Sequence, residues 1–104
     1  MKILLTGAFG QLGRSIQQLF NNDQIIATDF ESLDITSMDA VLLMVEAEKP
    51  DVIINCAAYT AVDQCETEQD MAYRVNAIGP KHLAVAAETY GCELVHISTD
   101  YVFS

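Results

Sequence analysis

The segment Thr6-Gly7-Ala8-Phe9-Gly10-Gln11-Leu12-Gly13-Arg14 directly follows the apolar run Ile3-Leu4-Leu5 and opens a stretch with helical spacing of its apolar residues. A GxxGxxG pattern at a strand-to-helix turn is typical of phosphate-binding loops. Gly7 would make the tight exit from the strand, Gly10 would let the backbone approach a pyrophosphate, and Gly13 would let the helix pack closely on the sheet. The alternative is a glycine-rich turn that only connects two elements.

The backbone amides at the start of this predicted helix would present the positive end of the helix dipole to such an anion. The chain has little other positive charge, because fifteen acidic residues face five basic ones, for a formal charge of −10. Nucleic acids and anionic membranes are captured by concentrated Lys and Arg, so we expect neither partner. The predicted cofactor-binding residues of the loop are Gly7, Phe9, Gly10, Gln11, Leu12 and Gly13.

Four short apolar runs have the composition of strands buried on both faces: residues 3–5, 24–28, 52–54 and 94–97. Segments with helical spacing lie between them, at about 11–20, from near 37 onward, and from 63 to about 90. This alternation requires right-handed crossovers and a parallel sheet covered on both faces. We therefore predict an α/β fold with a Rossmann-like doubly wound sheet, of about four strands in the spatial order 3-2-1-4.

Local signals mark the ends of two predicted helices. Ser37 can cap the start of the second helix, and Pro50 follows its end. In the third helix, Gly79-Pro80 predicts a kink or a division into two pieces, because proline lacks the backbone N–H. Gly91 suits the left-handed residue after the last turn.

Asp29 stands at the predicted end of the second strand, 22 residues after Gly7. A carboxylate in that place accepts hydrogen bonds from the adenosine ribose of a dinucleotide. An acid there disfavours a 2′-phosphate and so favours NADH, while Arg14 would offset part of the repulsion and keeps NADPH open. Without this spacing, Asp29 would be an ordinary solvated loop acid.

Two further segments are candidates for cofactor contact. Asp34 and Ile35 lie where a polar and an apolar side chain could flank an adenine edge, although Asp34 could equally cap the turn before Thr36. The segment Asn55-Cys56-Ala57-Ala58-Tyr59 follows the third strand, and Ala57, Ala58 and Tyr59 are its predicted contacts. Small side chains there leave room for a cofactor to cross the sheet edge, but a close-packed turn would need the same residues.

Composition indicates an ordered protein of a reducing compartment, with 51% hydrophobic and 19% charged residues. No apolar run approaches the roughly 18 residues that span a bilayer, and the apolar start is too short for a signal-peptide core. Cys56, Cys65 and Cys92 are widely spaced and form no CxxC pair, so neither a disulfide framework nor a zinc site is indicated. We expect a cytoplasmic protein without a membrane partner.

Four segments together resemble the extended short-chain dehydrogenase/reductases and, more narrowly, the dTDP-4-dehydrorhamnose reductase family. They are the glycine loop of residues 6–13, Asn55-Cys-Ala-Ala-Tyr-Thr-Ala-Val-Asp63, Val75-Asn76 and Ser98-Thr-Asp-Tyr-Val-Phe103. The resemblance covers essentially the whole chain. The glycine motif is shared by the superfamily, whereas the second and fourth segments are specific to the narrower branch.

This resemblance implies reduction of the 4-keto group of dTDP-6-deoxy-L-lyxo-4-hexulose to dTDP-L-rhamnose by NADPH or NADH, with the dTDP-sugar as partner. It implies that Thr99 is the hydroxyl member of a Thr-Tyr-Lys triad and hydrogen-bonds the substrate carbonyl oxygen as negative charge develops there. It implies also that Tyr101 lies beside the substrate. Thr99 would otherwise satisfy a local backbone group. Asn76 would brace the sheet edge or a water near the nicotinamide, or be a buried, backbone-bonded side chain.

The Tyr and Lys of that triad belong to a YxxxK motif, in which the Lys lowers the pKa of the phenol, and the sequence contains no such motif. We therefore expect residues 1–104 to be the N-terminal part of an NAD(P)-binding Rossmann domain, without the rest of that domain and without the substrate domain. We expect this chain alone to bind cofactor weakly or not at all and to be inactive. A homodimer is one expected assembly of the parent protein.

We expect no metal. Family members are linked to magnesium through an acid whose position in the first helix holds Ser15 here. The acidic cluster at the start of the third helix is then a solvated, dipole-favoured turn: Asp63, Glu66, Glu68 and Asp70. Two other functions stay open. One is a nucleotide-sugar epimerase or dehydratase of the same superfamily, which retains its NAD, and the other is a non-catalytic regulatory subunit related to the partner of methionine adenosyltransferase.

Overall fold

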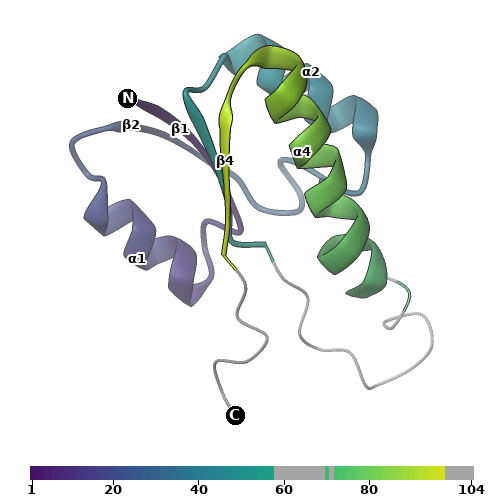
Figure 1. Cartoon of the computed structure of the whole chain (residues 1–104). Helices are drawn as coiled ribbons and strands as arrows, with labels where there is room; N and C mark the ends of the chain where they lie inside the picture. Colours follow the sequence, from purple (N-terminus) through teal and green to yellow (C-terminus); the bar gives the residue numbers. More distant parts are fainter. Residues whose placement is uncertain (58–69, 71, 98–104) are drawn as a thin grey trace.

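Four parallel strands alternate with helices in the computed structural model, which describes residues 1–57, 70 and 72–97 (Figure 1). The elements in chain order are β1 (Lys2–Thr6), α1 (Gln11–Leu19), β2 (Gln24–Ala27), α2 (Met38–Glu48), β3 (Val52–Asn55), η1 (Arg74–Ile78), α4 (Gly79–Tyr90) and β4 (Glu93–His96). The predicted α/β class with a parallel, doubly wound sheet is confirmed. Within the described residues, no helix combines the length and the apolar character needed to cross a membrane.

The strand order differs from the predicted 3-2-1-4, because the sheet runs β2-β1-β3-β4. Right-handed crossovers allow the third strand either to lie beyond β2 or to return to the other side of β1. The chain takes the second course, and Leu4 of β1 lies opposite Ile53 of β3. The buried Ile53 and Ile54 favour a central strand, whereas β2 begins at the exposed Gln24 and suits an edge. The sheet thus has the other common order of doubly wound folds.

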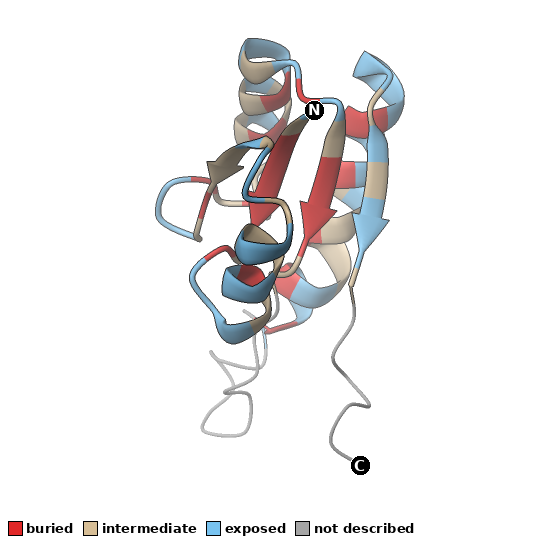
Figure 2. Cartoon of the chain, turned by 90° about the vertical axis from the view of Figure 1, so that its left-hand side faces the viewer, coloured by how far each residue is buried: buried red, intermediate tan, exposed pale blue. Residues whose placement is uncertain are grey.

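Each face of the sheet has its own apolar core. Leu4 and Ile53 face α2 and α4, where they pack against Val41, Val45 and Leu83. On the opposite face α1 covers the remaining buried apolar strand residues, which are Ile3, Leu5 and Ile54. Figure 1 shows α1 on one side of the sheet and α2 with α4 on the other, and Figure 2 shows the buried residues concentrated in the two central strands.

The ends of α2 and α4 follow the local sequence. Ser37 caps α2, since its side-chain oxygen accepts the amide N–H of Ala40 at 3.2 Å. Gly91 ends α4 in the left-handed region at φ 73°. The predicted break at Gly79-Pro80 takes the form of a π-helical turn, η1, in which the Gly79 N–H donates to the carbonyl of Arg74. The start of the third helix that was predicted at Asp63 lies outside the described residues.

Candidate functional site

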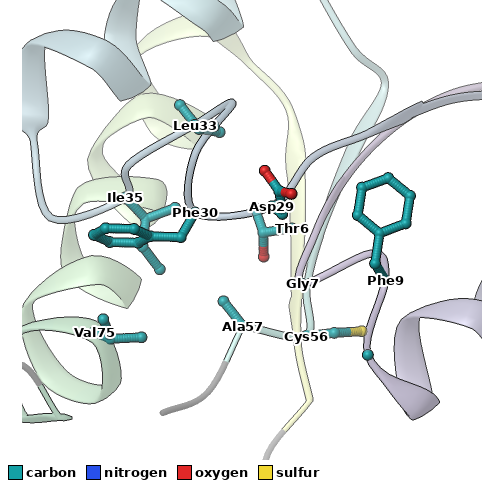
Figure 3. A pocket seen from close by; sticks show the side chains of 11 residues that line it. Thr6, Gly7, Phe9, Asp29, Phe30, Leu33, Ile35, Cys56, Ala57 and Val75 are labelled. Carbon is teal, nitrogen blue, oxygen red and sulfur yellow. The ribbon is translucent and has the colours of Figure 1, made fainter.

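A cavity of about 480 Å³ opens at the carboxyl ends of β1 and β3. The chain leaves β1 toward β2 on one side and leaves β3 toward β4 on the other, so the cavity lies where the strand order reverses. Open α/β sheets bind their ligands at this switch point. The residues that line the cavity are Thr6, Gly7, Phe9, Gly10, Asp29, Phe30, Leu33, Ile35, Cys56, Ala57 and Val75 (Figure 3).

The glycine loop forms one wall of this cavity. Gly7 has a φ of +64°, and a β-carbon on it would lie 2.6 Å from the carbonyl carbon of Cys56, so only glycine fits. A β-carbon on Gly13 would overlap the carbonyl oxygen of Gly7, which explains the close packing of α1 on the loop. Gly10 is different, because a β-carbon added there would contact only the Gly7 carbonyl oxygen, at 3.7 Å. The backbone at Gly10 therefore borders open space on the cavity side.

The N-terminus of α1 is open to an anion. Gly10 occupies the capping position in an extended conformation and offers no side-chain cap, and the first turn contains no acidic residue. The positive end of the helix dipole is therefore neither neutralised by a cap nor opposed by a carboxylate of the first turn. Phe9, which is half exposed, lines the cavity, whereas Gln11 and Leu12 are not among the lining residues.

Asp29 lies on the cavity wall just after β2, as its spacing predicted, and is held by a local turn. Its Oδ1 accepts the Ser32 N–H at 2.9 Å and the Ser32 hydroxyl at 3.1 Å. The Ser32 amide is the largest cause that holds the pKa of this carboxyl below its ordinary value. The site therefore carries a fixed carboxylate charge at neutral pH.

Asp34 and Ile35, predicted as a pair, have different surroundings. Oδ1 of Asp34 accepts both the N–H and the hydroxyl of Thr36, at 2.9 and 2.6 Å, and Asp34 is not a lining residue. Ile35 lines the cavity and is buried, with 2% of its surface exposed. It is fixed from α4, because Nδ1 of His82 lies 2.9 Å from the Ile35 carbonyl oxygen and Gly79 packs against the Ile35 side chain.

The turn after β3 closes the cavity opposite the loop of Asp29 and Phe30 (Figure 3). Ala57, one of the predicted contacts, donates its N–H to Oδ1 of the buried Asn55 at 3.1 Å. The half-buried Cys56 lies beside it, and burial raises the pKa of its thiol. The other predicted site residues of this edge lie outside the described part of the chain: Ala58, Tyr59, Thr99 and Tyr101.

Sequence reasoning did not select several lining residues. Phe30, which is 48% exposed, follows Asp29 directly, and an aromatic side chain beside a predicted ribose acid is a signal that could have found it. Thr6 ends β1 immediately before the glycine loop and carries a similar positional signal. Leu33 and Val75 have none, because their apolar type and spacing equally fit the core in which both are buried. Asn76 lies in η1 and is exposed.

The fold, the uncapped helix start behind a glycine loop, and the acid after β2 are features of the doubly wound α/β class to which nucleotide-binding proteins belong. Comparison with known proteins narrows this class. Residues 1–104 match the family model described as the RmlD substrate binding domain. The chain belongs to this family.

Several relatives of this chain are named dTDP-4-dehydrorhamnose reductase. A dTDP-4-dehydrorhamnose reductase of Aggregatibacter actinomycetemcomitans is 49% identical over 98% of this chain and 36% of its own length. The crystal structure of such a reductase from Clostridium acetobutylicum is 58% identical, with a TM-score of 0.87 over 99% of this chain and 38% of its own. The Bacillus anthracis reductase, solved in complex with NADP, is 48% identical, with a TM-score of 0.85 over 98% of this chain and 37% of its own. The chain thus spans little more than a third of the length of these relatives.

Proposed function

We propose that this chain is the N-terminal, cofactor-binding part of an NAD(P)H-dependent sugar-nucleotide reductase. The proposed reaction converts the 4-keto group of dTDP-6-deoxy-L-lyxo-4-hexulose to the hydroxyl of dTDP-L-rhamnose. The observation that carries the proposal is the cavity at the sheet's switch point, bordered by Gly10 and by the fixed carboxylate of Asp29. The relatives named dTDP-4-dehydrorhamnose reductase at 43–58% identity support the choice of substrate.

The lining residues fit a dinucleotide. The free edge of Gly10 and the uncapped start of α1 suit a pyrophosphate, which needs backbone amides and close approach. Asp29 would accept the hydroxyls of the adenosine ribose through the oxygen that Ser32 does not use. The apolar group of Phe30, Leu33 and Ile35 would bind the flat face of an adenine. A nicotinamide cofactor would supply the hydride for the ketone.

Two residues of this chain would contribute to the reaction, one by stabilising charge on the substrate carbonyl and one by binding the sugar. Thr99 would donate a hydrogen bond to the substrate carbonyl oxygen and stabilise the negative charge that develops there. Tyr101 would contact the sugar. Both roles rest on the family resemblance and stay predictions, as do the homodimer and the cytoplasmic location.

The cofactor could be NADH or NADPH. The Asp29 carboxylate is charged at neutral pH and would repel a 2′-phosphate, while the exposed Arg14 of α1 would offset part of that repulsion. The Bacillus anthracis reductase was solved with NADP, which supports a site that tolerates the phosphate. We therefore propose use of both cofactors, with the selectivity set in part by Asp29.

The test is turnover by the intact protein that contains this chain, with the 4-keto sugar and either reduced cofactor. We expect one cofactor oxidised for each dTDP-L-rhamnose formed, and a large loss of kcat in Thr99→Val that Thr99→Ser restores. A changed sugar without net cofactor oxidation would identify an epimerase or a dehydratase instead. Cofactor and sugar that both stay unchanged would favour a regulatory subunit.

A further inference from the structure

Asn55 is the buried polar centre of the sheet's carboxyl edge. It is the last residue of β3, none of its surface is exposed, and its side chain joins three segments. Oδ1 accepts the hydroxyl of Thr6 at the end of β1 and the N–H of Ala57, while Nδ2 lies 2.9 Å from Nδ1 of His96 at the end of β4. Thr6 and Ala57 both line the cavity.

These contacts assign the role of Nδ1 of His96 in the bond to Asn55. The backbone N–H of Ala57 can only donate, so the side-chain atom of Asn55 that it meets is the oxygen. The amide nitrogen therefore faces His96, and an amide nitrogen can only donate. Nδ1 of His96 must then be the acceptor, which requires an unprotonated Nδ1. A proton on Nδ1 would set two donors against each other at hydrogen-bond distance.

The strand register places the three hydrogen-bonded side chains next to one another across the sheet. Thr6 lies opposite Asn55 in the β1–β3 pair, and Asn55 lies opposite His96 in the β3–β4 pair. Their alternation along the strands puts all three on the face that carries α2 and α4, the face of Leu4, Ile53 and Leu94. Only the side chain of Asn55 therefore lies between His96 and the cavity-lining residues Thr6 and Ala57.

We propose that His96 is a positioning residue for the cofactor site: neutral His96 holds Asn55, and Asn55 holds the Ala57 amide and Thr6 in place at the cavity wall. Protonation of His96 breaks the bond to Asn55 and releases this wall. The network itself follows from the hydrogen bonds, whereas its effect on cofactor affinity rests on the proposed function.

Other titratable groups occupy β3 and α4, which contact β4, and η1, which contacts α4. They are Cys56 after β3, Tyr73 and Arg74 at η1, and Lys81 and His82 on α4. Tyr73, Arg74 and Lys81 are exposed. His82 meets a carbonyl oxygen, so its Nδ1 is a donor whether the ring is neutral or charged. His82 is thus a matched histidine whose own bond survives protonation.

The first readout needs no cofactor. In the intact protein labelled with ¹⁵N-alanine, we expect the Ala57 amide resonance to shift between about pH 8 and about pH 5.5, the interval in which histidines ordinarily titrate. The shift should vanish in His96→Asn, whose amide oxygen still accepts from Asn55 and cannot titrate, and should persist in His82→Gln. An Ala57 resonance that is flat in the wild type, or that shifts equally in His96→Asn, would overturn the proposal.

The second readout is cofactor affinity over the same interval. We expect the wild-type Kd for reduced cofactor to rise about tenfold at the acidic end, the effect of roughly one net hydrogen bond, and to change much less in His96→Asn. Asn55→Asp should remove the rise or reverse its sign, because its carboxylate still accepts from Thr6 and Ala57 and can accept from a Nδ1–H of His96 in both the neutral and the charged ring. Circular dichroism checks that each variant is folded.

The two possible failures are distinguishable. Equal pH dependence of Kd in the wild type and His96→Asn, or the wild-type sign in Asn55→Asp, would contradict the positioning role. A protein whose Ala57 amide titrates as expected but that binds neither cofactor at any pH would instead contradict the proposed function.

Discussion

Gly7 is the residue at which the site and the fold depend on the same backbone conformation. Its φ of +64° lies in the left-handed region, and an added β-carbon would lie 2.6 Å from the carbonyl carbon of Cys56. We expect Gly7→Ala to lower the free energy of unfolding by about 3 kcal/mol or more, measured by urea denaturation, because strain and overlap add.

Gly91→Ala is the matched control for this substitution. Gly91 has a similar φ of +73°, but a β-carbon there would meet nothing within 4 Å. Its substitution should cost only the conformational strain, about 1–2 kcal/mol. Equal losses in the two variants would show that contact with Cys56 contributes nothing at Gly7.

Asp29 makes a separate prediction about cofactor choice. Its carboxylate lines the cavity and is held by Ser32, so Asp29→Asn removes the charge while its amide oxygen can still accept from Ser32. We expect the ratio of kcat/KM for NADPH over NADH to rise severalfold in the intact protein, since the repulsion between the carboxylate and the 2′-phosphate is removed. Asp34→Asn is the control, because the Asp34 carboxylate accepts the Thr36 N–H and does not line the cavity. An unchanged ratio in Asp29→Asn would exclude contact with the ribose.

The same carboxyl should affect stability at acid pH. The Ser32 amide lowers its pKa in the folded protein, so its contribution to stability is present above the unfolded pKa, near 3.9, and is lost as the pH falls through the lower folded value. We therefore expect wild type to exceed Asp29→Asn in urea midpoint at pH 6 by a small margin that disappears near pH 2. A difference that grows toward low pH would contradict this sign.

At the residue scale, the sequence marks residues by their position after predicted strands, and it does not mark residues that are selected by packing. Gly7 and Asp29 are marked by their position after strands, and both line the cavity. Asn55 carries no such mark, because nothing in a single sequence shows that a buried amide will face His96, 41 positions later. Burial and partners come from the register of strands that are distant in sequence.

Among the elements, the junction of η1 and α4 sets the wall of the cavity. Gly79 lies in helical conformation, where alanine is intrinsically favoured by about 1 kcal/mol, yet its β-carbon would lie 2.5 Å from Cδ1 of the buried Ile35. We expect Gly79→Ala to be destabilising by about 1–2 kcal/mol and to weaken cofactor binding, because the overlap displaces a lining side chain.

A double-mutant cycle tests this cause. Ile35→Val removes Cδ1, so the Gly79→Ala substitution should cost less in that background than in the wild type, although Cγ1 at 2.7 Å leaves part of the overlap. The measurement is the free energy of unfolding of the four proteins. Additive effects would mean that the two positions do not share this contact.

The arrangement of the elements was predictable in part. Alternating runs predicted parallel strands with covering helices, and Ser37 begins α2 and Gly91 ends α4 as their local chemistry requires. The strand order was wrong because crossover handedness permits both orders, and only the greater burial of β3 than of β2 distinguishes them. That difference depends on which strands become neighbours, and so on the whole sheet.

At the scale of the whole molecule, the net charge of −10 should make stability dependent on salt. The described residues contain two ion pairs, Met1 with Asp23 and Lys2 with Glu48, and both are partly exposed, so screening them costs little. Screening of the general repulsion among acids gains more. We therefore expect the free energy of unfolding to rise as NaCl increases from about 0.01 to about 0.15 M, over which the Debye length falls from roughly 30 to roughly 8 Å.

A variant with fewer acids separates this repulsion from other effects of salt. Glu46, Glu88 and Glu93 are exposed, and the first two lie toward the C-terminal ends of α2 and α4, where the helix dipole disfavours negative charge. Their combined replacement by Gln removes three negative charges without touching the cavity. The variant should be more stable than the wild type at low salt and should gain less from added NaCl, because less repulsion is left to screen. An equal gain in both proteins would assign the salt effect to solvation of apolar surface rather than to charge.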